Sequence, residues 1–143
     1  MSRYLVVTHQ TAFSRELQRS VRALLAEDPA AEFTVLVPEA PRAARTWEGE
    51  TVDAAELRAE AAKALLEDTT GARVVRTTIG VTDPLQAIAD ELGARPGYDT
   101  LVICTLPPGI SRWLKLDLVH RTERKFGLRV IHVVADVRTA TPR

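Results

Sequence analysis

Apolar residues gather in five short runs along this chain. The runs are 4–8 (YLVVT), 33–37 (FTVLV), 73–81 (RVVRTTIGV), 100–105 (TLVICT) and 130–137 (VIHVVADV). Runs of this length that are rich in β-branched residues are typical of strands buried on both faces of a parallel sheet. The run 73–81 is the least apolar of the five, so we expect that strand to lie near an edge of the sheet.

Between the runs, apolar residues recur three and four positions apart, which is the period of an amphipathic helix. Four core-facing stripes are predicted: Leu17, Val21, Leu24 and Leu25; Leu57, Ala61, Ala64 and Leu65; Leu85, Ile88, Ala89 and Leu92; and Leu118, Thr122 and Phe126. Strands and helices therefore alternate along the whole chain.

Residues that favour helix ends flank these stripes. The predicted N-terminal caps are Thr11 or Ser14, Asp53 and Asp83, and the predicted C-terminal stops are Asp28, Gly71, Gly93 and Gly127. Short polar side chains at an N-cap accept hydrogen bonds from free amides, and glycine readily adopts the left-handed conformation that ends many helices. Asp28 precedes a proline, which disfavours the helical conformation at that position.

This alternation predicts an α/β fold, namely a three-layer, Rossmann-like open sheet of five parallel strands with helices on both faces. The length of 143 residues is that of one ordinary domain, so residues 1–143 are expected to form a single domain.

The composition bounds the class of protein. Hydrophobic residues make up 45% and charged residues 27% of the chain, and no apolar run approaches the roughly 20 residues that cross a membrane. The first residues enter a strand directly without a signal-peptide pattern, and the single cysteine suits a reducing compartment. We therefore expect a cytoplasmic protein that makes no membrane contact.

Charge is distributed unevenly although the net charge is zero. Residues 1–106 carry 11 Lys and Arg against 16 Asp and Glu, a balance of −5, whereas residues 107–143 carry 8 against 3, a balance of +5. Because nucleic-acid-binding domains are usually basic overall, nucleic acid is not an expected partner. The basic end is expected to form a solvated helix face.

Two segments resemble the universal stress protein family: GVTDPLQAI at 80–88 and YDTLVI at 98–103. Members of that family similarly carry a glycine, an Asp-Pro helix start and a Tyr/Ala-Asp-Leu-Ile-Val strand, and the resemblance covers the whole chain. It implies a parallel sheet with the strand order 3-2-1-4-5. One branch of the family binds ATP through the signature G-x2-G-x9-G-[ST], which follows the fourth strand.

The ATP signature is altered in this chain. At the matching spacing, Cys104, Pro107 and Asp117 replace the three glycines, and Leu118 replaces the hydroxyl residue. Glycine lets backbone amides approach phosphate, whereas proline has no amide and an aspartate repels phosphate. We therefore expect a divergent member that lacks standard ATP binding, in which Asp117 instead caps the helix that follows. The acidic residue that the family carries after the first strand is also absent, since this stretch reads Thr-His-Gln at 8–10.

A ligand crevice is nevertheless expected at the carboxyl ends of the strands, where open α/β sheets bind their ligands. The candidate ligand-binding residues at this edge are Thr8, His9, Val37, Thr105, Pro108, Gly109, Ser111, Arg112, Lys115 and Asp117. Arg112 and Lys115 could replace the lost amides as point charges for a small anionic ligand. The identity of any cofactor stays open.

No catalytic or metal-ligating pattern is found. The segment Gly109-Ile-Ser-Arg-Trp113 falls one residue short of a G-x-S-x-G nucleophile elbow, because the bulky Trp113 stands where that sharp turn needs a small residue. The three histidines lack metal-site spacing. Cys104 is expected to be a small buried apolar residue.

Three functions stay open from the sequence. The first is a non-enzymatic universal-stress-type protein with a degenerate nucleotide or anion crevice, acting in stress response or signalling. The second is an ATP- or AMP-binding switch with weak ATPase activity. The third is a protein-interaction module that uses the basic helix 118–126 and the loop 38–52, which contains Trp47.

The resemblance also implies that the last strand is an edge. Its apolar residues are Val130, Ile131, Val133, Val134, Ala135 and Val137, with no proline or lysine among them. An apolar edge that is not blunted invites pairing with another chain, so we expect a homodimer through 130–137.

Overall fold

The chain forms a five-stranded sheet flanked by helices. The computed structural model describes residues 2–8, 14–39, 52–109, 111–115 and 117–135, together with their side chains except at 52–55, 112 and 115. The elements in chain order are β1 (Arg3–Val7), α1 (Arg15–Glu27), β2 (Glu32–Pro38), α2 (Val52–Thr70), β3 (Arg73–Gly80), α3 (Pro84–Ala94), β4 (Thr100–Thr105), α4 (Arg112–Lys115), α5 (Leu118–Phe126) and β5 (Arg129–Val134).

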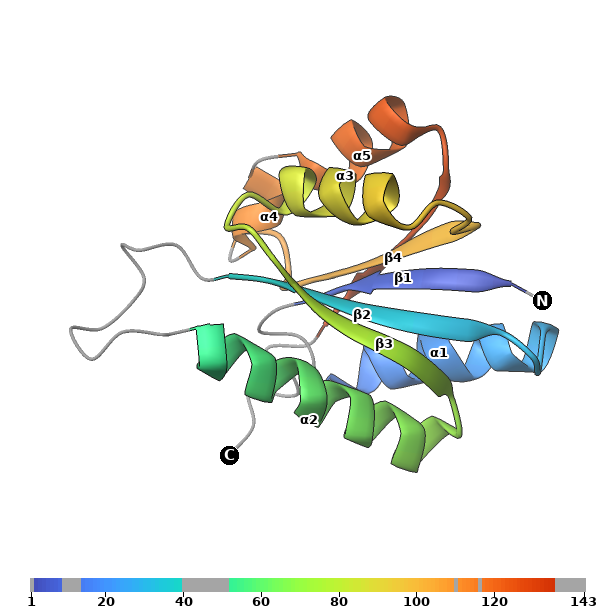
Figure 1. Ribbon diagram of the computed structural model, residues 1–143. Coiled ribbons are helices and arrows are strands. Elements are labelled where there is room, and N and C mark those ends of the chain that lie inside the picture. Colours follow the sequence, from blue (N-terminus) through green and yellow to red (C-terminus); the bar gives the residue numbers. More distant parts are fainter. Residues whose placement is uncertain (1, 9–13, 40–51, 110, 116, 136–143) are drawn as a thin grey trace.

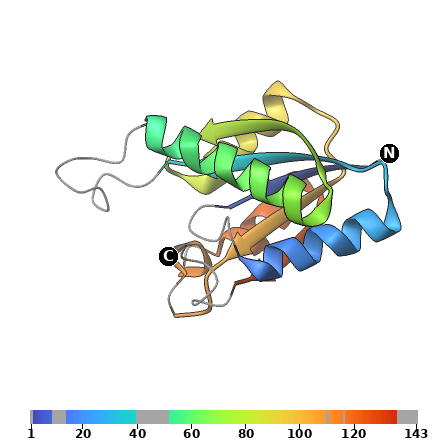
Figure 2. The same ribbon diagram turned by 90° about the horizontal axis from the view of Figure 1, so that it is seen from below.

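All strand pairs are parallel and their order is β3-β2-β1-β4-β5. Helices α1 and α2 cover one face of the sheet, and α3 and α5 cover the other (Figure 1). Seen from below, α1 and α2 lie side by side across their face (Figure 2), where Arg22 of α1 donates to the Thr69 carbonyl of α2 at 2.9 Å. The predicted α/β class, the strand order and the edge position of 73–81 are confirmed.

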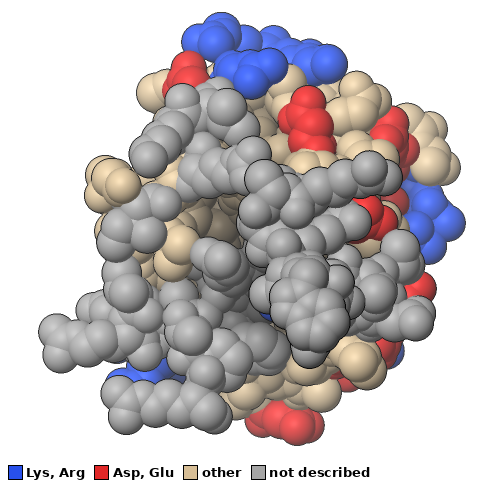
Figure 3. All heavy atoms as spheres, turned by 90° about the vertical axis from the view of Figure 1, so that its left-hand side faces the viewer, with Lys and Arg blue, Asp and Glu red and all other residues tan. Residues whose placement is uncertain are grey.

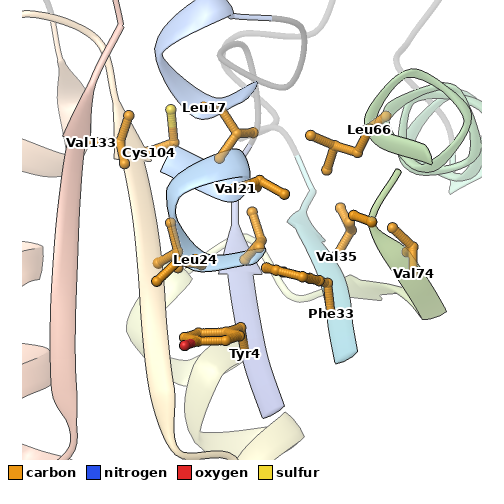
Figure 4. Packing of buried hydrophobic residues seen from close by; sticks show 14 of the residues in the cluster. Tyr4, Leu17, Val21, Leu24, Phe33, Val35, Leu66, Val74, Cys104 and Val133 are labelled. Carbon is orange, nitrogen blue, oxygen red and sulfur yellow. The ribbon is translucent and has the colours of Figure 1, made fainter. Parts of the chain in front are cut away.

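A large apolar core lies between the sheet and the α1/α2 layer. Leu17, Val21 and Leu24 from α1 and Leu66 from α2 point into this core, to which all five strands contribute side chains (Figure 4). The rings of Tyr4 and Phe33 stack in this core with centroids 5.2 Å apart. The α1 stripe is thereby confirmed, with Leu25 only partly buried at its margin.

The opposite face of the sheet forms a second core. The strand side chains that alternate with those of the first core point to this face. They include Leu5, Leu36 and Ile103, which pack against Ile88 of α3 and Leu118 of α5. Because consecutive side chains of a strand point to opposite faces, strands with helices on both sides must be apolar throughout. In the α5 stripe, Leu118 and Thr122 are buried and Phe126 packs at the margin of this core.

The predicted helix ends at Ser14, Asp28, Asp83 and Gly127 are confirmed. Ser14 accepts the Leu17 amide at 3.2 Å, and Asp83 accepts the Leu85 amide at 3.0 Å. Gly127 ends α5 with a positive φ of 64°, which favours glycine. Asp28 caps the end of α1, as expected from the proline that follows it.

The predicted inward stripe of α2 is wrong. Ala59, Ala62 and Leu66 are buried, whereas Leu57, with 72% of its surface exposed, lies on the solvent side together with Ala61 and Ala64. The α2 sequence is rich in alanine on both sides, so its hydrophobic pattern supports two orientations. Packing against β2 and β3 selects the orientation that buries Leu66.

Several predicted boundaries also need correction. Helix α2 begins at Val52, before the predicted cap at Asp53, and α3 continues through Gly93 to Ala94. Ala87 rather than Ala89 is buried in α3. A short helix, α4, was not predicted, and β5 ends at Val134 rather than at 137. Trp47 lies outside the described residues, as does most of the loop 38–52.

In the described part of the chain, no helix is both long and apolar enough to cross a membrane.

Candidate ligand-binding crevice

The carboxyl ends of β1 and β4, where the sequence predicts a crevice, lie at the point at which the strand order reverses. From β1 the chain continues to β2 on one side, and β4 pairs with β1 on the other. Crossovers leave in opposite directions from such a point, which opens a crevice above the strand ends. Figure 3 views the molecule from this end, with Lys and Arg gathered along the top, the side on which Figure 1 places α5.

The described candidate residues at the ends of β1 and β2 are buried rather than open to a ligand. Thr8 is fully buried, and its amide donates to the Leu36 carbonyl at 3.1 Å. Val37 is also fully buried and belongs to the apolar core on the α1/α2 face. Val37 therefore contributes packing, and His9 lies outside the described residues.

Three backbone amides in the loop after β4 and in α4 are bonded locally. The Ser111 amide donates to the Pro107 carbonyl at 3.0 Å, and the Leu114 amide donates to the Ser111 hydroxyl at 3.2 Å. The Asp117 amide donates to the Leu114 carbonyl at 3.0 Å. Since proline has no amide, Pro107 and Pro108 cannot donate either. A phosphate bound through these three amides would therefore have to compete with bonds that already exist.

Asp117 occupies the N-cap position of α5 but does not cap the helix, so this prediction is wrong. Its backbone is left-handed, with φ 54° and ψ 40°, and its side chain accepts no hydrogen bond from a backbone amide of the first helical turn. The carboxylate instead contacts His120 Nδ1 at 2.9 Å and Arg124 Nη2 at 3.7 Å. A capping side chain needs an extended N-cap backbone, which this residue lacks.

Thr105 makes a polar contact that sequence patterns did not indicate. Its hydroxyl lies 2.8 Å from His132 Nε2 on β5, and the Thr105 side chain is almost completely buried. Burial lowers the pKa of His132, and the nearby His120 lowers it further. A neutral imidazole is therefore favoured beside Thr105, at the β4 side of the crevice.

The remaining predicted residues lie on the loop and on α4. Pro108 and Gly109 are exposed, and Gly109 has a φ of 88°. Arg112 and Lys115 are the first and last residues of α4. The backbone thus carries both cationic residues next to the loop that follows β4.

No arrangement suited to catalysis or metal binding emerges in the described chain. Ser111 is 3% exposed and its hydroxyl accepts the Leu114 amide, so it serves as a cap rather than as an exposed nucleophile. Among the described residues, no group of three or more His, Cys, Asp and Glu is placed to hold a metal ion. Cys104 is buried, as predicted, and its sulfur lies 3.7 Å from the Ser14 hydroxyl.

A hollow between α2 and β3 was not predicted from the sequence. It has a volume of about 450 Å³ and is lined by Glu56, Ala59, Glu60, Thr77, Thr78 and Ile79. The Thr77 hydroxyl donates to the Glu60 carboxylate at 2.8 Å. Glutamates four positions apart on a helix beside two adjacent threonines on a strand would have been the available signal.

Comparisons with solved structures identify the fold. One similar structure is a universal stress protein in complex with cAMP, with 18% identity and a TM-score of 0.57 over 92% of this chain and 96% of that chain. Another is a universal stress protein from Archaeoglobus fulgidus, with 16% identity and a TM-score of 0.60 over 93% of each chain. No protein-family model and no curated protein matches the sequence.

The chain therefore has the fold of the universal stress proteins, and the fold implied by the resemblance is confirmed.

Proposed function

We propose that this chain is a non-enzymatic, cytoplasmic protein of the universal stress type, acting in stress response or signalling. Its crevice is a degenerate nucleotide site that accepts a small anionic ligand with a single phosphate and does not hold a triphosphate in the standard manner. The complex of one structural neighbour with cAMP supports the ligand class.

The observation that carries this proposal is the internal bonding of the loop after β4. The amides of Ser111, Leu114 and Asp117 all have partners within the loop, and two prolines contribute no amide. A triphosphate needs several free amides, whereas one phosphate can be held by point charges such as Arg112 and Lys115. Both charges lie on α4, beside the loop.

Thermal melting with cAMP, AMP, ADP and ATP tests the proposal. A ligand present at 100 times its Kd adds about 2.7 kcal/mol to the free energy of unfolding. For a domain of this size we expect the monophosphates to raise Tm by roughly 6–10 °C, and ATP to raise it less.

The variant carrying both Arg112→Ala and Lys115→Ala should lose most of this increase and most of its dependence on salt, since exposed charges are screened. A sub-micromolar affinity for ATP would show that the loop rearranges to free its amides. If no nucleotide changes Tm, the ligand proposal fails while the fold assignment stands.

We further propose that β5 mediates a homodimer. Strand β5 pairs only with β4 among the described strands, and Val134 on it is 40% exposed. The Ala135 amide donates to the Thr105 carbonyl at 2.8 Å, so alternation along the strand directs the amides of Val130, His132 and Val134 away from β4. These outward amides can pair with a second copy across a twofold axis.

His132→Pro should abolish the dimer, because proline removes one outward amide while edge strands tolerate it. His132→Ala is the matched control, since it loses the same imidazole but keeps the amide. Light scattering at micromolar concentration should give about twice the chain mass of 15.7 kDa for the wild type and for His132→Ala. A monomeric wild type would disprove this interface.

A further inference from the structure

Strand β3 forms the edge of the sheet opposite β5. Strand β3 pairs only with β2 among the described strands. It is irregular at its start, where Val75 lies between the residues paired with Phe33 and Thr34 and is 50% exposed. From Arg76 to Gly80 the pairing with β2 is regular. This part of the edge therefore lacks a bulge, which would hinder pairing with another strand.

The direction of the backbone groups follows from one hydrogen bond. The Glu39 amide donates to the Gly80 carbonyl at 3.0 Å, so Gly80 faces β2. Because the backbone groups of a strand alternate in direction, those of Thr77 and Ile79 face away from β2. Thr77 and Ile79 also line the hollow between β3 and α2. The outward backbone groups and the hollow therefore lie at the same place.

The rim of the hollow is acidic. Helix α2 places Glu56, Glu60, Lys63 and Glu67 along one side, at intervals of three and four residues, which gives two net negative charges. On β3, Arg73 is within 3.8 Å of Glu32, and Arg76 lies within 3.4 Å of Glu91, on the α3 side of the sheet. Figure 1 shows α2 running below β3 along this edge.

We propose that the β3 edge binds an extended polypeptide segment that carries Lys or Arg at alternate positions. Such a segment would add a strand beside β3 by bonding to the outward backbone groups of Thr77 and Ile79. Alternate side chains of an added strand point to the same face, so every second residue would enter the hollow on the α2 side. There a cationic side chain meets Glu56 and Glu60, which gives the edge its preference for a basic partner.

A 10-residue fluorescent peptide of alternating Val and Lys is the probe, and fluorescence anisotropy measures its Kd. A peptide of alternating Val and Glu controls for charge. A Val-Lys peptide with N-methylated amides controls for backbone pairing, since it keeps the charge but cannot donate. We expect the Val-Lys peptide to bind at least tenfold more tightly than either control.

Two pairs of protein variants locate the site. Thr77→Pro and Thr77→Ala both lose the hydroxyl, but only the proline loses the outward amide, so we expect at least tenfold weaker binding for proline. The double variant Glu56→Gln, Glu60→Gln should bind several-fold more weakly and with a smaller salt dependence.

Equal binding of the N-methylated peptide would reduce the interaction to charge attraction and overturn the proposal, whether or not Thr77→Pro folds. The proposal is also overturned if no peptide binds, or if His132→Pro on β5 weakens binding while Thr77→Pro does not.

Discussion

Leu66→Ala is expected to lower the free energy of unfolding by about 2–5 kcal/mol, whereas Leu57→Ala should change it by less than about 0.5 kcal/mol. Both leucines lie on α2, but Leu66 is fully buried in the core and Leu57 is 72% exposed. Truncating a buried leucine removes its packing and leaves a cavity, while truncating an exposed leucine removes little contact.

Urea unfolding of both variants measures this difference, since the midpoint shifts in proportion to stability when the slope is unchanged. The pair keeps the chemical change constant and alters only the position on the helix. Equal losses for the two variants, or a larger loss for Leu57→Ala, would mean that α2 packs with the stripe expected from its sequence pattern.

Glu91→Ala should destabilise the protein by about 3 kcal/mol, because it removes the centre of a buried polar cluster. Glu91 is 5% exposed and accepts the Tyr98 hydroxyl at 2.7 Å. Arg76 and Arg95 approach its other oxygen at 3.4 and 3.7 Å. Burial raises the pKa of Tyr98, and the Glu91 carboxylate raises it further, so this phenol stays protonated as a donor.

We expect a loss of stability at the lower end of the roughly 3–5 kcal/mol that breaking a buried ion pair costs. The Arg76 and Arg95 side chains are 32% and 43% exposed, so water can partly replace the lost carboxylate. The loss is still a large part of the 5–15 kcal/mol that stabilises a typical domain.

Asp90→Ala is the matched control for Glu91→Ala. Asp90 is the preceding residue of α3 and its side chain, bonded to Gln86, is exposed, so its loss should cost less than about 0.5 kcal/mol. Chemical denaturation of both variants measures the difference in their free energies of unfolding. A Glu91→Ala variant as stable as Asp90→Ala would show that the cluster contributes no net stability.

Glu91 illustrates why sequence patterns reach only part of the core. The predicted α3 stripe included Ile88 and Leu92. A glutamate between them is expected to point into solvent. The carboxylate is buried because Tyr98 and Arg76, 7 and 15 residues away along the chain, supply its partners. Such partners become neighbours only through the packing of α3 on the sheet.

The predicted crevice shows the same contrast between what the sequence indicates and what only the packing determines. Its location at the ends of β1 and β4 follows from strand order, and the loss of the glycine motif was visible in Cys104, Pro107 and Asp117. The bonds that occupy the Ser111, Leu114 and Asp117 amides, and the contact between Thr105 and His132, were not visible. They depend on loop geometry and on the pairing of β4 with β5.

The sequence by itself determined the five strands, the α1 stripe, the cap at Asp83 and the parallel α/β class, because these follow from local periodicity and local hydrogen bonding. Only the tertiary structure decided which side of α2 is buried, since alanines on both sides make the local pattern ambiguous. It also decided the need for glycine at position 80, where a Cβ atom would stand 2.4 Å from the Ala87 Cβ of α3. That requirement arises from the close approach of β3 and α3, a distance that no local pattern contains.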